Sequence, residues 1–239
     1  MTQGPWTREL GNGRYGVILS DAGGGASACA GIALNRFAGD PVEDAHGFFI
    51  YLRDADSGKR WCATRQPGLE DPVRYNVTAD ASHVLFRREE LDIASSLRVS
   101  LVPGCDAEQR RLSLHNLSDR NRRIEVTSYV EIALAPPMAD RVHPAFSKLF
   151  VQTSMLDDGK TLVASRRARA QGERWPALFH ALEGAPVQAW ETDRLRFVGR
   201  GRSAVDALAC MEGTLGNVLD PVFSLRTTLD LPPGQSREI

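Results

Sequence analysis

Apolar and polar residues alternate along most of this chain, with a period of two rather than 3.6. From Leu91 to Leu101 the odd positions are apolar apart from Ser95, and the even positions include Asp92, Ser96, Arg98 and Ser100. Such alternation predicts a half-buried β-strand of about ten residues, because successive side chains of a strand point to opposite faces. The Pro-Gly pair at 103–104 then ends this strand.

A second region of alternation follows a polar segment. Leu112 and Leu114 alternate with polar residues, and the segment 116–121 has the composition of a turn. Beyond it the even positions are again apolar, at Ile124, Val126, Val130, Ile132 and Leu134. The pattern predicts an antiparallel hairpin, strand to strand through the segment 116–121, with one face in water.

Similar runs recur along the chain. Strands are predicted at 48–52 with a return at Trp61 and Ala63, at 74–78, at 84–87 and at 223–231. Helical patterning is limited to two turns over 203–211, with Ser203 as the N-cap. Because a parallel α/β fold needs helical crossovers, we expect an all-β fold, a large antiparallel sandwich of two sheets with few short helices.

Composition narrows the function classes. The 239 residues carry a formal charge of −1, with 42% hydrophobic and 25% charged residues, which excludes a disordered chain and gives no electrostatic pull toward nucleic acid. No apolar run is long enough to span a membrane, and the first residues do not have the pattern of a signal peptide. We treat residues 1–239 as a single domain. Because Arg237-Glu238-Ile239 has the character of a strand cut short, we expect the domain to be truncated from a larger protein.

The four cysteines, Cys29, Cys62, Cys105 and Cys210, are far apart in sequence and form no CxxC or CxxH pair. This spacing argues against a zinc site and against a disulfide framework. We expect four reduced thiols, mostly buried, and no metal.

Two segments are candidates for chemistry. The glycine-rich segment 12–27 lacks the GKS or GKT of a phosphate loop, so we interpret Asn12-Gly13 as a type I′ hairpin turn and Gly23–Gly25 as a close approach of backbones. The segment 135–148 is predicted to be a loop that carries Arg141, His143 and Lys148, three side chains that suit a sugar hydroxyl or a phosphate. The alternative is a solvated loop whose charges only keep it soluble.

Tryptophans are the natural candidates for sugar stacking, because apolar sugar faces pack on indole rings. We single out Trp61 and Trp175 as candidate substrate-binding residues, while noting that a tryptophan in a sandwich is more often part of the core. We name no catalytic residue, because no paired carboxylates and no GxSxG motif stand out. The cluster 166–169, with three arginines, is interpreted as a wet strand face or loop.

Several long motifs resemble glycoside hydrolase family 94, and most of all the C-terminal phosphorylase-like region of bacterial cyclic β-1,2-glucan synthases. The motifs are LGNGRYGVILSDAGGGAS at 10–27, FIYLRD at 49–54, TSYVE at 127–131, LAPP at 134–137, HPAFSKLFV at 143–151, RFVGRGR at 196–202 and GNVLDPVFSLR at 216–226. The resemblance spans nearly the whole chain.

The resemblance implies an N-terminal super-sandwich similar to galactose mutarotase, followed in the family by an (α/α)₆ barrel. In the family, the barrel holds the general acid and inorganic phosphate is the co-substrate, so the resemblance implies no catalytic residue and no cofactor in this chain. It implies a non-catalytic domain that supports the barrel and its glucan pocket. The implied partners are a β-glucan oligosaccharide, the barrel of the parent chain and a possible homodimer. The implied location is the cytoplasmic side of a bacterial inner membrane.

Two other functions stay open. One is a stand-alone enzyme of the mutarotase type, which needs a general acid and a general base on either side of a sugar ring. Five histidines allow it by count, although none forms a pair with a carboxylate that the sequence singles out. The other is a purely structural module for dimerisation or docking.

Overall fold

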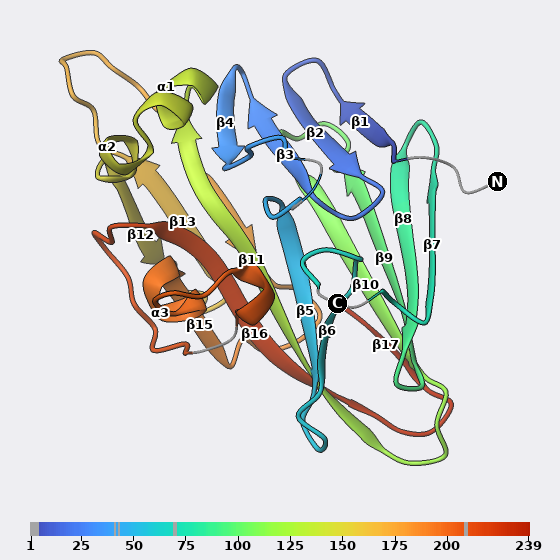
Figure 1. Ribbon diagram of the computed structural model, residues 1–239. Helices are drawn as coiled ribbons and strands as arrows, with labels where there is room; N and C mark the ends of the chain where they lie inside the picture. The colour runs from blue at the N-terminus through green and yellow to red at the C-terminus, as the bar shows by residue number, and fades with distance from the viewer. Residues whose placement is uncertain (1–4, 41, 43, 69–70, 208–209) are drawn as a thin grey trace.

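The fold is an antiparallel β-sandwich with few short helices, as expected (Figure 1). The computed structural model describes residues 5–40, 42, 44–68, 71–207 and 210–239. The large sheet contains β1 (Thr7–Gly11), β2 (Tyr15–Ser20), β3 (Gly25–Cys29), β4 (Ile32–Asn35), β5 (Phe48–Asp54), β6 (Arg60–Cys62), β11 (Arg122–Ala135), β15 (Ala189–Asp193) and β16 (Pro221–Leu231). A second sheet contains β7 (Arg74–Ala79), β8 (His83–Glu90), β9 (Ile93–Leu101), β10 (Glu108–Asn116) and β17 (Ser236–Glu238). A third contains β12 (Val151–Met155), β13 (Thr161–Arg166) and β14 (Leu178–Ala181).

The long strand β11 organises the large sheet. One of its edges pairs with β16 over residues 122–131. Its other edge pairs first with β5, from Ile124 to Val130, and then with β4, from Ile132 to Ala135. Strands that are far apart in sequence therefore meet on this one strand.

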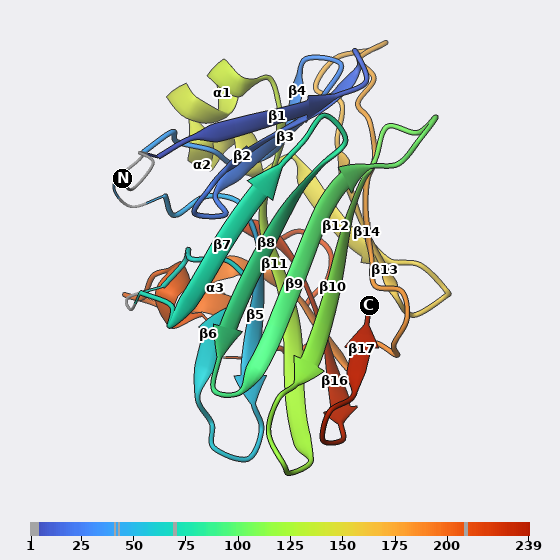
Figure 2. The same cartoon turned by 90° about the vertical axis from the view of Figure 1, so that its right-hand side faces the viewer.

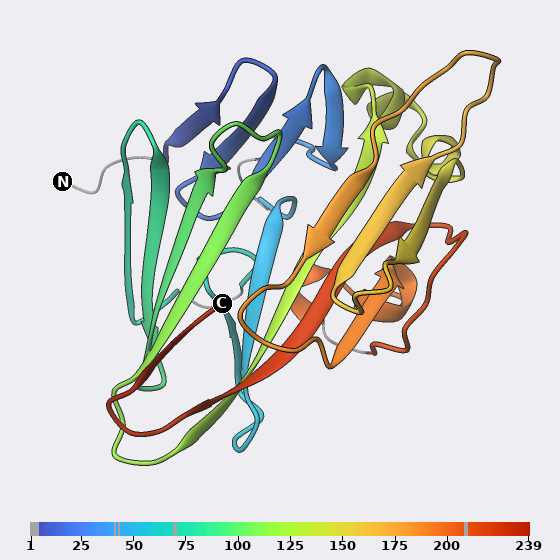
Figure 3. The same ribbon diagram turned by 180° about the vertical axis from the view of Figure 1, so that it is seen from behind.

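The two smaller sheets lie side by side over the same face of the large sheet (Figures 2 and 3). The even positions of β11 explain this arrangement. Ile124 and Val126 pack in one apolar cluster with β8, β9 and β10, whereas Ile132 and Leu134 pack in another with β12 and β13. The covering layer is thus divided into two sheets, where the sequence predicted a single second sheet. Full burial of one such aliphatic side chain stabilises the fold by about 1.5–3 kcal/mol.

The opposite face of the large sheet carries a third, aromatic cluster. Tyr51, Tyr129 and Phe197 meet there, with the Tyr129 and Phe197 rings stacked at a centroid distance of 4.8 Å. Phe197 belongs to helix α3 (Arg194–Val198), which Asp193 caps by accepting a hydrogen bond from the Leu195 backbone N–H. Strand β11 is therefore buried on both faces over most of its length. The predicted solvent-exposed face is present only at its start, where Arg123 is exposed and Glu125 is half-buried.

The predicted hairpin through the segment 116–121 was also wrong, because β10 and β11 lie in different sheets. The free edge of β10 pairs instead with β17, with Leu114 opposite Arg237. Asn116 holds the connection between the sheets by donating to the backbone oxygens of Arg120 and Leu231 at 2.7 and 2.8 Å. The apolar alternation was correct for both strands, but alternation does not specify which strands pair.

The turns differ from the sequence interpretation in detail. Leu91 and Asp92 both have positive φ and form the turn between β8 and β9, so the strand begins at Ile93. The hairpin at Asn12-Gly13 is present, but only Gly13 has a positive φ, which is not a type I′ turn. Instead, the Asn12 carboxamide oxygen accepts hydrogen bonds from the backbone N–H groups of Arg14 and Tyr15.

The close approach predicted at Gly23–Gly25 is confirmed. A Cβ on Gly25 would lie 2.1 Å from the Ile18 carbonyl oxygen, and one on Gly23 would lie 2.3 Å from the Thr64 Cβ. No side chain larger than hydrogen fits at such separations without displacement of the neighbour. The segment leads into strand β3 rather than into a helix, so it has no phosphate-loop architecture.

The helices and cysteines also differ from expectation. The predicted two-turn helix over 203–211 is a single 3₁₀ turn, η1 (Ala204–Asp206), and residues 208–209 lie outside the described residues. Cys29 and Cys62 are buried, whereas Cys105 and Cys210 are exposed, and all four thiols are free. The expectation of mostly buried thiols therefore holds for two of the four.

Candidate functional site

The segment that follows β11 is helical, not a loop. It forms α1 (Pro137–Val142) and α2 (Pro144–Lys148), joined at His143. Each helix begins with a proline at its first turn, where the missing N–H would in any case have no partner within the helix. Both helices lie at the end of β11 that pairs with β4 (Figure 1).

This helical segment exposes large apolar side chains. Met138, Val142, Phe146 and Leu149 are 64%, 57%, 53% and 45% exposed, and we refer to these four with Arg141 and His143 as the α1–α2 surface. Four large apolar side chains exposed within one short segment make this segment a candidate for contact with another protein segment. Its exposure therefore calls for an explanation other than the packing of this chain.

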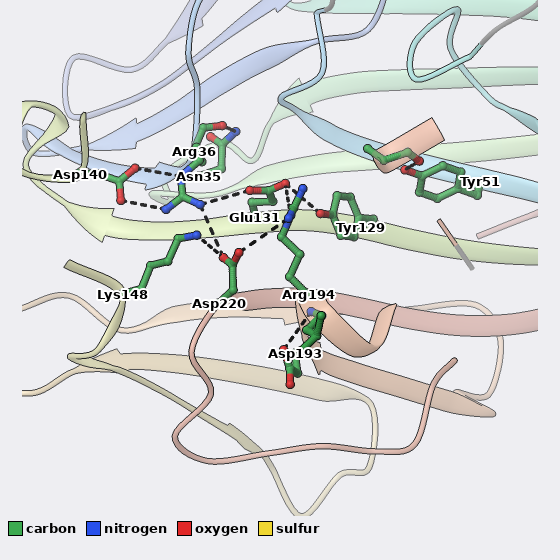
Figure 4. Close-up of polar contacts among 12 residues, drawn as sticks. Asn35, Arg36, Tyr51, Tyr129, Glu131, Asp140, Lys148, Asp193, Arg194 and Asp220 are labelled. Carbon is green, nitrogen blue, oxygen red and sulfur yellow. Dashed lines mark hydrogen bonds and ion pairs between the residues drawn. The ribbon is translucent and has the colours of Figure 1, made fainter. Parts of the chain in front are cut away.

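Beneath the α1–α2 surface lies a network of charged side chains (Figure 4). Arg36 bridges it: its Nη2 and Nε lie 3.0 and 3.2 Å from the two carboxylate oxygens of Asp140, and its Nη1 lies 3.3 Å from Glu131 Oε2. The two-pronged contact with Asp140 attaches helix α1 to the segment that follows β4.

Asp220 and Glu131 join further cations to the same network. Lys148 Nζ lies 2.5 Å from Asp220 Oδ1, which attaches α2 to the residue before β16. Arg194 Nε lies 2.8 Å from Glu131 Oε1, and the Tyr129 hydroxyl donates to that oxygen at 2.9 Å. The network thus ties α1, α2 and α3 to the end of strand β11.

Three cations face three carboxylates in this network, and the pKa values reflect their pairing. Burial raises the pKa of the Glu131 carboxyl, but the charges of Arg194 and Arg36 and the Arg194 hydrogen bond outweigh it, so that the pKa lies below its ordinary value. Burial and the neighbouring Glu131 raise the Tyr129 pKa well above its ordinary value. Burial lowers the Arg36 pKa, but contacts with Asp140, Glu131 and Asp220 raise it above its ordinary value. Near pH 7 Glu131 and Arg36 therefore stay charged and Tyr129 stays neutral. Groups with such pKa values are suited to hold structure rather than to exchange protons.

The structure brings some of the sequence candidates together. Lys148 belongs to the network, where Asp220 neutralises it. Arg141 and His143 are exposed on the α1–α2 surface, and neither side chain makes a hydrogen bond or an ion pair within the described part of the chain. Trp61 is elsewhere, 7% exposed in the core between the large and five-stranded sheets.

Trp175 joins the same end of the molecule through an arginine. The Arg166 guanidinium carbon lies 4.9 Å from the centre of the Trp175 ring, and Arg166 Nη1 donates to the Ser147 carbonyl of α2 at 2.9 Å. Arg166 is buried, so the interpretation of the whole cluster 166–169 as wet was wrong for this residue. Its guanidinium also lies over Phe150, which meets Phe146 edge to face at 5.1 Å.

Sequence reasoning missed Arg36, Glu131, Asp140 and Arg194, and one signal was present. Glu131 is a carboxylate between Val130 and Ile132 in a strand that is otherwise apolar near its end, and a charge in that position must find a cation. The other members come from separate elements and share no spacing. Within the described ranges, no group of three or more His, Cys, Asp or Glu residues is placed to hold a metal, and no helix is long and apolar enough to cross a membrane.

Comparison with known proteins adds independent information. The profile of a family described as glycosyl hydrolase 94, supersandwich domain, matches residues 1–239. The chain is 36% identical over 236 residues to cyclic beta-(1,2)-glucan synthase NdvB of Rhizobium meliloti (strain 1021), a match that covers 95% of this chain and 8% of that protein. It is 30% identical over 240 residues to N,N'-diacetylchitobiose phosphorylase of Vibrio furnissii, covering 97% of this chain and 30% of that protein.

A solved structure shares the fold. A polysaccharide lyase aligns with a TM-score of 0.54 at 16% identity, over 98% of this chain and 31% of that one. The chain thus spans less than a third of the length of these relatives.

Proposed function

Because this chain belongs to the supersandwich domain family of glycosyl hydrolase 94, we propose that it is the non-catalytic sandwich of a larger enzyme acting on glycosidic bonds. In this proposal the α1–α2 surface seats the helical catalytic domain and forms one rim of its β-glucan pocket. The proposal assigns no bond-breaking step to this chain. It includes the location implied by the family resemblance, the cytoplasmic side of a bacterial inner membrane.

The observation that carries the proposal is the pairing of an exposed apolar surface with a rigid support beneath it. Met138 and Phe146 are more than half exposed, yet their helices are attached to the sheet by Asp140 and Lys148. A mobile loop would lose conformational entropy on docking, whereas a segment already held by ion pairs loses less. Rigid exposed apolar side chains therefore suit a permanent contact with another part of the same protein.

The size of the relatives supports a helical domain as the occupant. The chain covers 8% of the glucan synthase and 30% of the phosphorylase named above, so most of each relative lies outside the aligned region. The family resemblance of the sequence implies that an (α/α)₆ barrel follows the sandwich. Leu195 and Leu219 are also exposed, at 56% and 76%, and follow or precede Arg194 and Asp220 of the same network in sequence.

The proposed contribution to the glycan pocket comes from the polar residues of the same surface. Arg141 and His143 have free side chains there, and Trp175 lies close by through its contact with Arg166. Guanidinium and imidazole groups can donate hydrogen bonds to sugar hydroxyls or to the inorganic phosphate of a phosphorolysis reaction. Lys148 holds α2 in position in this proposal, since its ammonium group forms an ion pair with Asp220.

The test uses the protein at its full natural length and measures turnover of linear β-1,2-glucan. Phe146→Asp introduces a charge into the proposed contact, and Leu117→Asp is the matched control, because Leu117 is 49% exposed on the loop between β10 and β11. We expect Phe146→Asp to lower kcat/KM at least about tenfold, since a buried unpaired charge weakens a contact by more than 1.4 kcal/mol. Equal activity of the two variants would refute docking at this surface.

A second pair of variants distinguishes glycan binding at the pocket from docking of the helical domain. Arg141→Ala is expected to raise KM about tenfold with a smaller effect on kcat, because it removes one hydrogen bond that the charged guanidinium donates to the substrate. Arg87→Ala, an exposed arginine on β8, is the control. An unchanged KM in Arg141→Ala would remove this residue from the rim, and a concentration-dependent mass in light scattering would indicate a second copy on the same surface.

A further inference from the structure

A cavity of about 770 Å³ lies between the two smaller sheets, over the large sheet. Its walls come from β10 and the residues before it on one side and from the segment 176–184, which includes β14, on the other. Its floor includes Phe48, Ser128 and Phe223 from β5, β11 and β16. The volume falls within the range of about 300–1,000 Å³ that is usual for small-ligand sites.

Aromatic rings form one part of the lining. His180 stacks on Phe223 at a centroid distance of 5.7 Å and meets Phe48 edge to face at 5.1 Å. Phe179 is 59% exposed and also lines the cavity. Ring faces and edges that border an open space suit the C–H faces of a sugar ring.

His180 supplies a directed polar group. Its Nε2 lies 2.8 Å from the Ser128 hydroxyl, and that oxygen already accepts the Leu225 backbone N–H at 3.0 Å. The same hydroxyl also lies 3.4 Å from the Leu225 carbonyl oxygen, to which it can donate, so the contact is compatible with either tautomer of His180. Within the described residues Nδ1 has no hydrogen-bond partner, so it is the ring nitrogen that can bond to a ligand hydroxyl, which donates or accepts according to the tautomer.

The charges around the cavity are paired within the protein. Arg110 Nε lies 3.2 Å from Glu108, and Arg110 Nη1 donates to the Phe48 carbonyl at 3.0 Å. Arg14 Nε lies 2.8 Å from Asp106 at the outer end. A charged ligand would have to break such a pair, whereas hydroxyl groups can donate to the carboxylates and accept from the guanidinium groups without breaking it.

We propose that this cavity binds a short neutral oligosaccharide, with His180, Glu108 and Arg110 as hydrogen-bonding groups and Phe48 and Phe179 as the apolar contacts. The site is separate from the α1–α2 surface, since no residue of α1 or α2 lines the cavity as described. This proposal rests on the proposed function only in that the sugar linkage of the probe is chosen to match the proposed glucan. Failure of this proposal would leave the docking proposal intact.

The experiment measures amide hydrogen exchange in the full-length protein, with and without the neutral trisaccharide sophorotriose. Binding in the cavity slows exchange in β14 (Leu178–Ala181) and at the start of β10. His180→Phe keeps an aromatic ring and removes the hydrogen-bonding nitrogens. We expect it to raise the sophorotriose concentration needed for half-maximal protection about five- to tenfold. His115→Phe is the control, because His115 has a similar contact with Ser236 at 2.9 Å on β10 outside the cavity lining.

A second variant tests the argument from charge and serves if His180→Phe does not fold. Glu108→Gln leaves Arg110 without its carboxylate partner, so a trisaccharide carrying a uronic acid should gain at least about threefold in affinity over the wild type. Three results would overturn the proposal. These are an absence of protection by sophorotriose in the wild type, equal protection in His180→Phe and His115→Phe, and no gain for the acidic sugar in Glu108→Gln.

Discussion

Replacement of Arg36 by methionine tests whether the ionic network holds helix α1 in place. Methionine keeps much of the side-chain volume but removes the guanidinium, which contacts Asp140 twice and Glu131 once. Arg194 remains beside Glu131, whereas Asp140 loses the one cation with which it forms an ion pair in the described part of the chain. The main effect is therefore one uncompensated carboxylate that is only 10% exposed.

The expected loss follows from the burial of that carboxylate. Removal of one partner of a buried ion pair destabilises a protein by about 3–5 kcal/mol. Because Asp140 retains some contact with water, we expect a loss near the lower end, about 3 kcal/mol. Arg53→Met is the matched control: Arg53 pairs with Glu125 at 2.7 Å, but its side chain is 36% exposed, so its loss should stay below about 1 kcal/mol.

Urea unfolding measures the global effect, and amide exchange measures the local one. Exchange should accelerate in α1 (Pro137–Val142) for Arg36→Met and not for Arg53→Met. The double variant Arg36→Met/Asp140→Asn should lose less than the two single variants combined, because it leaves no unpaired carboxylate. Equal losses for the two methionine variants, or simple additivity in the double variant, would contradict the assignment of Arg36 as the support of α1.

Two further predictions concern pH and packing. Burial, with the nearby charge of Arg110, lowers the pKa of His180 to about 4. The unfolded state binds this proton first as pH falls, so the contribution of neutral His180, about 3 kcal/mol, is present above pH 6.5 and is lost between pH 6.5 and 4. His180→Phe should remove that part of the dependence of the urea midpoint on pH. A ring resonance assigned to His180 that titrates near pH 6.5 would contradict it. Gly25→Ala should lower the free energy of unfolding by about 3 kcal/mol, because its Cβ would meet the Ile18 carbonyl oxygen. Gly11→Ala is its control in the same unfolding assay, with 3.6 Å to the nearest atom, and equal losses would contradict the steric explanation.

The strands were predictable because burial in a sandwich depends on a local property. Leu97, Val99 and Leu229 are each buried at positions that alternation assigns to the inner face. The pairing of strands was not predictable in the same way, since β10 and β11 both alternate and yet belong to different sheets. Which strands pair is decided by contacts across the whole fold, such as the bond from Asn116 to Leu231.

The helices and the network were missed for two different physical reasons. Helices α1 and α2 span six and five residues, too few for a helical period to be recognised, and their prolines were interpreted as loop residues. The network joins residues that are distant in sequence, from Arg36 to Asp220, and only Lys148 was singled out. Arg141 and His143 remain candidates, since they were singled out by residue type and the structure exposes both side chains.

The central position of β11 also constrains how the protein is made. During synthesis β5 and β4 emerge before β11, but its other partner, β16, begins only at Pro221, after the whole three-stranded sheet. Until then a nascent chain carries a fourteen-residue strand with one bare edge. Such edges recruit other chains into aggregates. A ribosome-bound chain of this kind therefore benefits from a holding chaperone, or from rapid translation between β11 and β16, more than a protein whose sheet closes in sequence order.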